Sequence, residues 1–161
     1  MDMKKFKYLL IVLILVFLSL YLYQNYIYYK IPYNPISKYA ATPSGFHITK
    51  NLPNGEEVSV KSHDVDACNK ALKYFSDLKL VPLKNKAAWN ENSKQKSQTY
   101  FSGMFEFTQS NSLSINEIYL DNLTILYISS DKPGFHNGYY KIVGSEFDYK
   151  YIYDLIDNSK E

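Results

Sequence analysis

The residues His63, Asp64, Asp66 and Cys68 form the densest group of possible metal ligands and nucleophiles in the sequence. Imidazole, carboxylate and thiolate groups can bind zinc together, and a thiolate beside a base can attack a carbonyl carbon. The spacing opposes both uses, because successive helical residues point about 100° apart and Cys68 lies on the apolar side of a predicted helix. We therefore interpret Cys68 as a small buried residue and predict no metal site here.

Other candidate chemistry is thinly spread along the chain. His47 and His136 are distant from this group and follow no ligand spacing, so we interpret them as surface or turn residues. Glu106 and Glu117 lie on predicted strands, where paired carboxylates can exchange protons, but their ordinary role is on a solvated sheet face. The sequence has no nucleophile elbow and no glycine-rich phosphate loop, so it predicts neither catalytic residues nor a cofactor.

The charge pattern excludes several kinds of partner. All 18 basic residues are lysines, so the two-pronged contacts that arginine makes with phosphate and guanine are absent. Four lysines and one aspartate precede residue 31, which leaves 14 lysines against 15 acidic residues in the remainder. Because this remainder has no excess positive charge, we predict that it does not bind nucleic acid.

An apolar segment follows the first lysines of the chain. Residues 8–29 contain no formal charge, and a helix of this length extends roughly 33 Å, against about 30 Å for the hydrocarbon core of a bilayer. No small-residue cleavage site follows the segment. We therefore predict that residues 1–30 form a basic flank and an uncleaved transmembrane anchor, with the bilayer as its partner, rather than a signal peptide.

The flanks of this segment predict its orientation. Three lysines precede it and only Lys30 and Lys38 follow closely, which places the N-terminus in the cytoplasm and the remainder outside the cell membrane. Tyrosine favours the interface, where its ring contacts lipid and its hydroxyl contacts water. The predicted interface residues are Lys4, Lys5, Lys7, Tyr21, Tyr23, Tyr26, Tyr28 and Tyr29.

The sequence after residue 30 predicts a short connecting segment followed by one domain. Residues 31–45 contain Pro32, Pro35 and Pro43, which favour extended backbone, so we predict a stalk there. Residues 46–158 are numerous enough to bury a single core.

Hydrophobic periodicity predicts an α+β fold for this domain, with an antiparallel sheet and two helices packed on one face. Asp64 is a predicted helix cap, and Pro82 indicates an edge strand or a strand end because proline cannot donate a ladder hydrogen bond. Ser145 and Asp148 have capping-box spacing, so we expect the last helix to begin after Gly144. The predicted strands are 46–50, 57–61, 79–83, 99–107, 113–120, 123–129 and 139–143, and the predicted helices are 65–78 and 145–156.

Residues 84–98 interrupt this pattern with a polar segment that has no convincing periodicity, and we predict a loop. Long loops often carry binding residues. The single tryptophan, Trp89, lies here and is the candidate contact residue outside the core. Packing of its ring back onto the sheet is the alternative.

Two segments resemble small uncharacterised, membrane-anchored extracytoplasmic domains of Gram-positive bacteria. One is the acid-capped helix and strand at 64–83, and the other is the strand at 139–142 with its closing helix. The resemblance implies a tethered α+β domain outside the membrane and assigns no site residue. Type IV pilins also join a long N-terminal helix to an α+β head, but their Gly-Phe-Thr-Leu-x-Glu pattern is missing, since residues 5–9 are Lys-Phe-Lys-Tyr-Leu.

These observations predict a bacterial single-pass membrane protein whose extracytoplasmic domain binds a protein or another envelope component without catalysis. Two alternatives stay open. One is an enzyme with an active site assembled from dispersed side chains, which a concave pocket with convergent polar groups would favour. The other is an anchored structural or pilin-like component, which self-association would favour.

Overall fold

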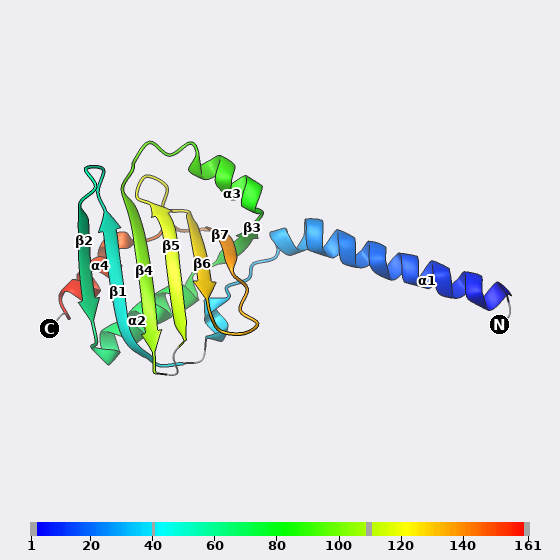
Figure 1. The fold of residues 1–161 in the computed structure, drawn as a ribbon, viewed down its shortest axis with the longest axis horizontal. Coiled ribbons are helices and arrows are strands. Elements are labelled where there is room, and N and C mark those ends of the chain that lie inside the picture. The colour runs from blue at the N-terminus through cyan, green and yellow to red at the C-terminus, as the bar shows by residue number, and fades with distance from the viewer. Residues whose placement is uncertain (1–2, 40, 109–110, 160–161) are drawn as a thin grey trace. The chain divides into compact units, whose positions relative to one another are not determined.

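The computed structural model describes residues 3–39, 41–108 and 111–159 of the 161-residue chain. The chain divides into two compact units, Met1–Ile31 and Pro32–Glu161. Figure 1 shows a helix in the first unit and a sheet with helices in the second.

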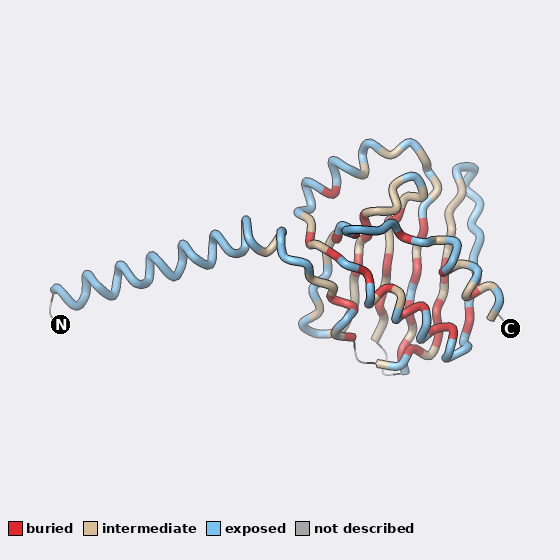
Figure 2. Tube along the Cα trace, turned by 180° about the vertical axis from the view of Figure 1, so that it is seen from behind, coloured by how far each residue is buried: buried red, intermediate tan, exposed pale blue. Residues whose placement is uncertain are grey.

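The first unit is one continuous helical segment. Helix α1 (Met3–Leu22) continues into a π-helical turn (Tyr23–Ile27) and a 3-10 turn (Tyr28–Lys30). Apolar side chains surround α1, and none of the span Lys4–Lys30 is buried; Figure 2 shows the exposed colour along α1. A helix that is apolar on all sides suits hydrocarbon better than water. The segment is long and apolar enough to span a membrane, a property that anchors and signal sequences share.

The second unit is built on a seven-stranded sheet in which every pairing is antiparallel. Its order is β2-β1-β4-β5-β6-β7-β3, so β1 and β2 form a hairpin, β4 to β7 form a meander, and β3 lies at an edge. Pro82 is in this edge strand, as expected from its missing N–H. The strands are β1 (Pro43–Asn51), β2 (Glu57–Ser62), β3 (Leu80–Leu83), β4 (Tyr100–Phe107), β5 (Ser112–Tyr119), β6 (Ile125–Ser130) and β7 (Gly138–Ile142).

Helices α2 (Val65–Asp77) and α4 (Tyr149–Asp157) lie against one face of the sheet (Figure 1). Asp64 caps α2 as predicted, since its Oδ1 accepts a hydrogen bond of 2.7 Å from the Ala67 N–H. Asp148 caps α4 in the same way through the Tyr151 N–H. Helix α4 therefore begins at Tyr149 and not at residue 145, because Asp148 is its first cap and not the third residue of a capping box.

The core lies between this face and the two helices. Phe46 and Ile48 of β1 point toward the helices and pair with Phe105 and Gly103 of β4. The Phe75 ring of α2 lies 6.2 Å from the Phe46 ring and 6.1 Å from the Phe105 ring, and all three side chains are fully buried. Because side chains alternate along a strand, the residues between these inward positions face away from the helices.

The stalk predicted for residues 31–45 is wrong, because this segment packs onto the domain. Ile36 and Tyr39 are only 1% and 6% exposed. The Tyr33 N–H donates to the Leu80 carbonyl at 2.8 Å, and Pro43 already belongs to β1. The compact unit begins at Pro32 and not near residue 46. Proline correctly predicted an irregular backbone, but the burial of the apolar side chains between the prolines keeps that backbone on the domain.

A third helix, α3 (Asn85–Asn92), occupies half of the polar segment predicted as a loop. Ala88 is its only buried residue. A helix that buries one alanine has no apolar stripe, so no periodicity revealed it. The backbone after α3 is held where the Asp121 carboxylate accepts hydrogen bonds from the Lys96 and Ser97 N–H groups at 2.9 and 3.0 Å.

Candidate functional site: the outer sheet face and the Tyr39 pocket

The face of the sheet opposite α2 and α4 presents a polar surface built from several strands. The described central residues carry hydroxyl, amide, imidazole and thioether groups, while the side chain of Glu117, next to Asn116, lies outside the described residues and Lys141 of β7 pairs with Ile125 on the same face. Neighbouring outward residues are paired across the strands, for example Met104 with Ser114 and Ser114 with Ser129. The central outward residues are His47, Thr49, Ser102, Met104, Ser114, Asn116, Tyr127 and Ser129.

Hydrogen bonds between strands orient part of this surface. The Ser102 hydroxyl donates to Asn116 Oδ1 at 2.7 Å, and the His47 ring nitrogen Nε2 bonds the Ser59 hydroxyl. Charges lie at the margin, where Lys61 Nζ meets both carboxylate oxygens of Glu106 at 2.9 and 3.2 Å. The described central residues are therefore uncharged, and Ser102, Asn116 and His47 are oriented by hydrogen bonds between strands.

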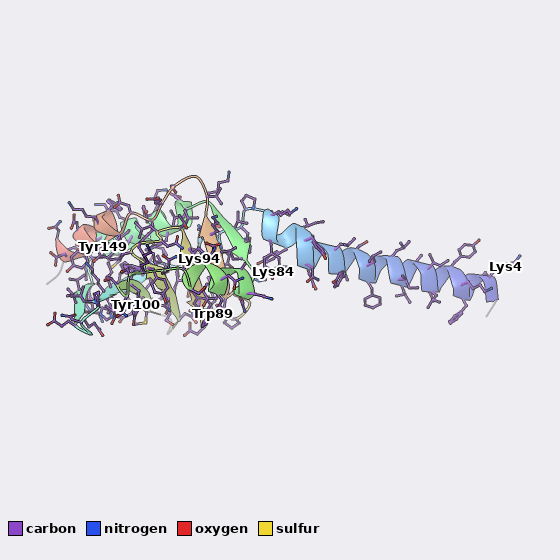
Figure 3. The ribbon with its side chains drawn as sticks, turned by 90° about the horizontal axis from the view of Figure 1, so that it is seen from above. Lys4, Lys84, Trp89, Lys94, Tyr100 and Tyr149 are labelled. Carbon is purple, nitrogen blue, oxygen red and sulfur yellow. The ribbon has the colours of Figure 1, made fainter. Side chains whose placement is uncertain are left out.

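Aromatic rings lie within and beside this centre. Tyr127 and Tyr139 lie 4.9 Å apart between ring centroids, and Tyr100 and Tyr119 lie 6.5 Å apart. Trp89 of α3 is 72% exposed and borders a small hollow with Tyr119, so its ring does not pack into the core. In Figure 3, Trp89 and Tyr100 lie on one side of the sheet and Tyr149 lies on the other.

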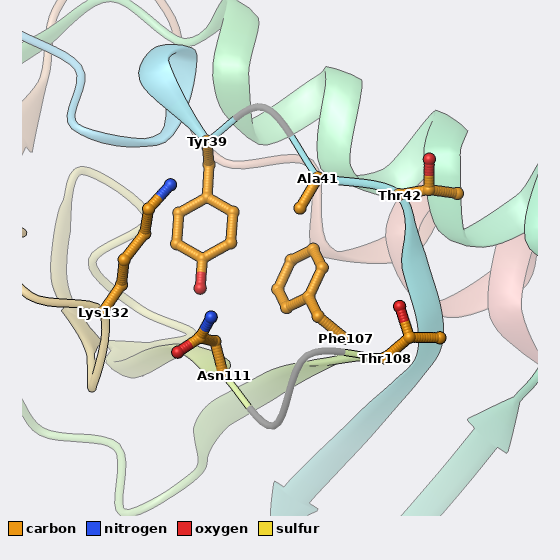
Figure 4. Close-up of a pocket in the computed structure, with 7 residues that line it drawn as sticks. All are labelled: Tyr39, Ala41, Thr42, Phe107, Thr108, Asn111 and Lys132. Carbon is orange, nitrogen blue, oxygen red and sulfur yellow. The ribbon is translucent and has the colours of Figure 1, made fainter.

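A second feature is a pocket of about 340 Å³ at one end of the sheet (Figure 4). It is formed by the segment before β1 and by residues that follow β4 and β6. Tyr39 forms its floor, and the Lys132 ammonium group lies 4.8 Å from the Tyr39 ring centroid. The other lining residues are Ala41, Thr42, Phe107, Thr108 and Asn111.

A smaller hollow of about 110 Å³ adjoins this pocket and shares Tyr39 and Lys132 with it. Its walls are mostly rings. Phe135 lies 5.8 Å from Tyr39, and His136 lies 5.6 Å from Tyr33, between ring centroids. Two prolines and Gly134 complete the lining.

The possible ligands between His63 and Cys68 do not converge on one point. Asp64 is occupied as a helix cap, Cys68 is in the core, and His63 Nδ1 lies 3.1 Å from the Ser44 carbonyl. Within the described part of the chain, no group of three histidine, cysteine or acidic side chains could hold a metal ion. Burial raises the pKa of Cys68 to about 11, with smaller contributions from Asp64 and Glu106, so the thiol is protonated at neutral pH.

The other candidates are also separated. His47 lies on the outer face and His136 borders the smaller hollow. Glu106 is paired with Lys61, and the side chain of Glu117 lies outside the described residues. Burial raises the pKa of Tyr149 to about 12, with smaller contributions from Tyr153 and Asp154, so this hydroxyl is no general base at neutral pH.

The residues assigned to the membrane interface lie at both ends of the apolar segment. The three lysines are in the first turns of α1, Tyr21 is in its last turn, and Tyr26 is in the π-helical turn. Tyr28 and Tyr29 follow in the 3-10 turn, where their rings meet edge to face at 5.2 Å. The polar Asn25 side chain within this region donates to the Tyr21 carbonyl at 3.0 Å.

No family model, curated protein or solved structure matches the chain. Sequence reasoning missed the pocket because Tyr39, Asn111 and Lys132 come from three distant segments. The signal that could have indicated it is the apolar Ile36 and Tyr39 between prolines, which is unusual for a solvated stalk.

Proposed function

We propose that this chain is a single-pass membrane protein whose domain is a non-catalytic binding module for an uncharged glycan of the cell envelope. The N-terminal residues lie in the cytoplasm and the domain lies outside the cell membrane. The lysines before the apolar segment and the tyrosines after it support this orientation.

The observation that carries the proposal is the outer sheet face, whose described central residues are uncharged, with aromatic rings within and beside it. Hydroxyl and amide groups match the hydroxyl groups of a sugar chain in hydrogen bonding, and aromatic rings pack on the apolar faces of sugar rings. Seven strands at about 4.8 Å spacing give a surface roughly 29 Å wide, enough for an extended polymer. None of the described central residues is a lysine, which disfavours an anionic polymer.

A protein partner is the competing occupant of this face. Protein interfaces have an apolar centre, whereas the described central residues here are mostly polar, with Met104 and the ring of Tyr127 between serine and asparagine side chains. The large exposed apolar group, Trp89, lies beside the face and not in its middle. The polarity pattern therefore supports a ligand that itself presents many hydroxyl groups.

The test uses the full chain in lipid nanodiscs and insoluble neutral cell-wall glycan stripped of peptide and phosphate. We expect the protein to sediment with the glycan and Trp89→Ala to lose at least tenfold in affinity. Tyr151→Ala is the matched control, because Tyr151 is an exposed aromatic residue on α4 and should leave binding unchanged. Equal binding by the wild type and Trp89→Ala, or no binding, would overturn the glycan assignment.

The location has a separate test. Protease added to intact bacterial cells from which the wall has been removed should degrade the domain, and membranes should retain the full-length chain. N-terminal sequencing should find residues 1–30 still attached. A product found in the cytosol, or one that lacks these residues, would contradict the anchored arrangement whatever the domain binds.

A further inference from the structure

The pocket at Tyr39 and Lys132 brings together polar groups that the fold itself does not use. The side chains of Thr42, Thr108 and Asn111 line it and make no hydrogen bond with other described residues. No carboxylate among the described residues forms an ion pair with Lys132. In Figure 4 the Asn111 amide lies near the Tyr39 hydroxyl, and the two threonine side chains lie at the opposite end of the pocket.

The floor of the pocket is rigid. Tyr39 is 6% exposed, and its hydroxyl lies 3.1 Å from the Ser130 hydroxyl and 3.4 Å from the Ser112 carbonyl. The Asp131 carboxylate accepts a hydrogen bond of 2.7 Å from the Ser112 N–H, which joins the start of β5 to the segment that carries Lys132. The lysine therefore extends from a backbone that is fixed on both sides.

We infer that this pocket binds the free carboxylate of a peptide C-terminus. Lys132 pairs with the carboxylate, and the Asn111 amide donates a hydrogen bond to it. One lysine next to Asp131 matches a single negative charge better than the double charge of a phosphate monoester. The threonine hydroxyls at the far end face the preceding peptide group.

The smaller hollow explains why the ligand is a peptide end and not an isolated anion. Because it shares Lys132 with the pocket, a side chain attached next to the bound carboxylate reaches the rings of Phe135 and His136. An apolar final side chain is thus recognised together with its carboxylate. This site lies at the end of the sheet, away from the outer face. The inference of carboxylate binding is therefore independent of the proposed glycan binding.

The test measures binding of N-acetyl-alanyl-leucine to the full chain in nanodiscs by calorimetry and by NMR of backbone amides. We expect saturable binding with shifts at Phe107, Thr108 and Asn111 and at residues 130–136. The C-terminal amide of the same peptide should bind at least tenfold more weakly, and acetate should also bind more weakly than the dipeptide. Equal affinity for acid and amide would overturn the carboxylate assignment, and equal affinity for acetate would overturn the role of the smaller hollow.

Two lysine variants distinguish binding at this pocket from a nonspecific effect of positive charge on the domain. Lys132→Met should lower the affinity for the dipeptide at least tenfold, while Lys150→Met on the exposed side of α4 should leave it unchanged. Thr108→Val removes an exposed hydroxyl without changing side-chain shape and should weaken binding severalfold while the domain stays folded. Unchanged affinity in both Lys132→Met and Thr108→Val, or the absence of any binding, would overturn the inference.

Discussion

The ring of Phe46 stacks on the ring of Phe105, with centroids 3.9 Å apart and planes inclined by 14°. The two residues pair across β1 and β4 in the middle of the core. Gly103 lies two residues before Phe105, and a Cβ atom there would lie 3.0 Å from Phe46 Cζ and 3.1 Å from Phe101 Cζ. The close approach of these rings depends on the missing side chain at position 103.

Gly103→Ala should therefore destabilise the domain. Inserting a methyl group into a packed core costs about 1–3 kcal/mol of the free energy of unfolding. Gly138→Ala in β7 is the control, because a Cβ at Gly138 has no atom within 4 Å among the described residues. Urea denaturation of the full chain in detergent, followed by circular dichroism, measures both variants. Equal stability of the two would contradict the packing argument.

Asn34→Ala should show that the segment before β1 belongs to the fold. The Asn34 side-chain amide donates to the carbonyls of Phe75 and Leu78, each at 2.8 Å, and its oxygen accepts from the Ile36 N–H at 2.9 Å. Losing these partly buried bonds should lower the free energy of unfolding by about 1–3 kcal/mol.

Asn90→Ala on α3 serves as the control for Asn34→Ala, because the exposed Asn90 side chain makes no hydrogen bond within the described residues. The same denaturation measurement applies. If Asn34→Ala were as stable as the control, residues 32–39 would be a detached linker after all.

Cys68 should be nearly inert to alkylation in the folded protein. With a pKa of about 11 instead of 9.0, its thiolate fraction at pH 8 is about 100-fold lower. Mass spectrometry after iodoacetamide treatment should find rapid modification in denaturant and slow modification without it. Similar rates in the two conditions would show that the sulfur is accessible and ionised.

The raised pKa of Cys68 also predicts a pH dependence. The thiol form is fully tolerated in the core below pH 9, and the ionised form is not, so the free energy of unfolding falls as the pH rises from 9.0 toward about 11. Cys68→Ala should remove part of this fall. The remainder belongs to groups such as Tyr74 and Tyr149, whose pKa values burial also raises.

Trp89→Ala and Phe75→Ala should differ sharply in stability. Trp89 is 72% exposed, so its removal should change the free energy of unfolding by less than about 0.5 kcal/mol, whereas loss of the fully buried Phe75 ring should cost about 3–5 kcal/mol. Thermal unfolding measures both. A large decrease in the free energy of unfolding of Trp89→Ala would mean that the Trp89 ring supports the fold. A binding defect in that variant would then not identify Trp89 as a contact residue.

The sequence predicted the elements whose side chains repeat at a regular period. The helix at Val65–Asp77 and the strands of the meander have such patterns, and Asp64 and Pro82 were correctly interpreted from their own chemistry. Helix α3 was missed because its single buried residue, Ala88, produces no pattern. Trp89 is a candidate contact residue because it is isolated in a polar segment, and the structure leaves its side chain exposed.

The reason why the sequence did not predict the pocket differs from the reason why it did not predict α3. Tyr39, Asn111 and Lys132 meet only because residues 32–39 fold back against the strands, a long-range contact that leaves no local periodicity. The outer face was predictable as a set of alternating polar residues. Which of these polar residues lie side by side on different strands was not predictable, since this depends on the strand order and register.

The strand order also has a consequence for synthesis. The second and third strands to leave the ribosome occupy opposite margins of the finished sheet, and four strands from later in the chain fill the space between β1 and β3. The N-terminal half of the chain therefore cannot form a complete hydrophobic core by itself. The sheet is completed only after β7 is synthesised, because β7 pairs with both β6 and β3. Chains truncated before residue 138 should consequently be recognised by proteases as unfinished, even though they contain both margins of the sheet.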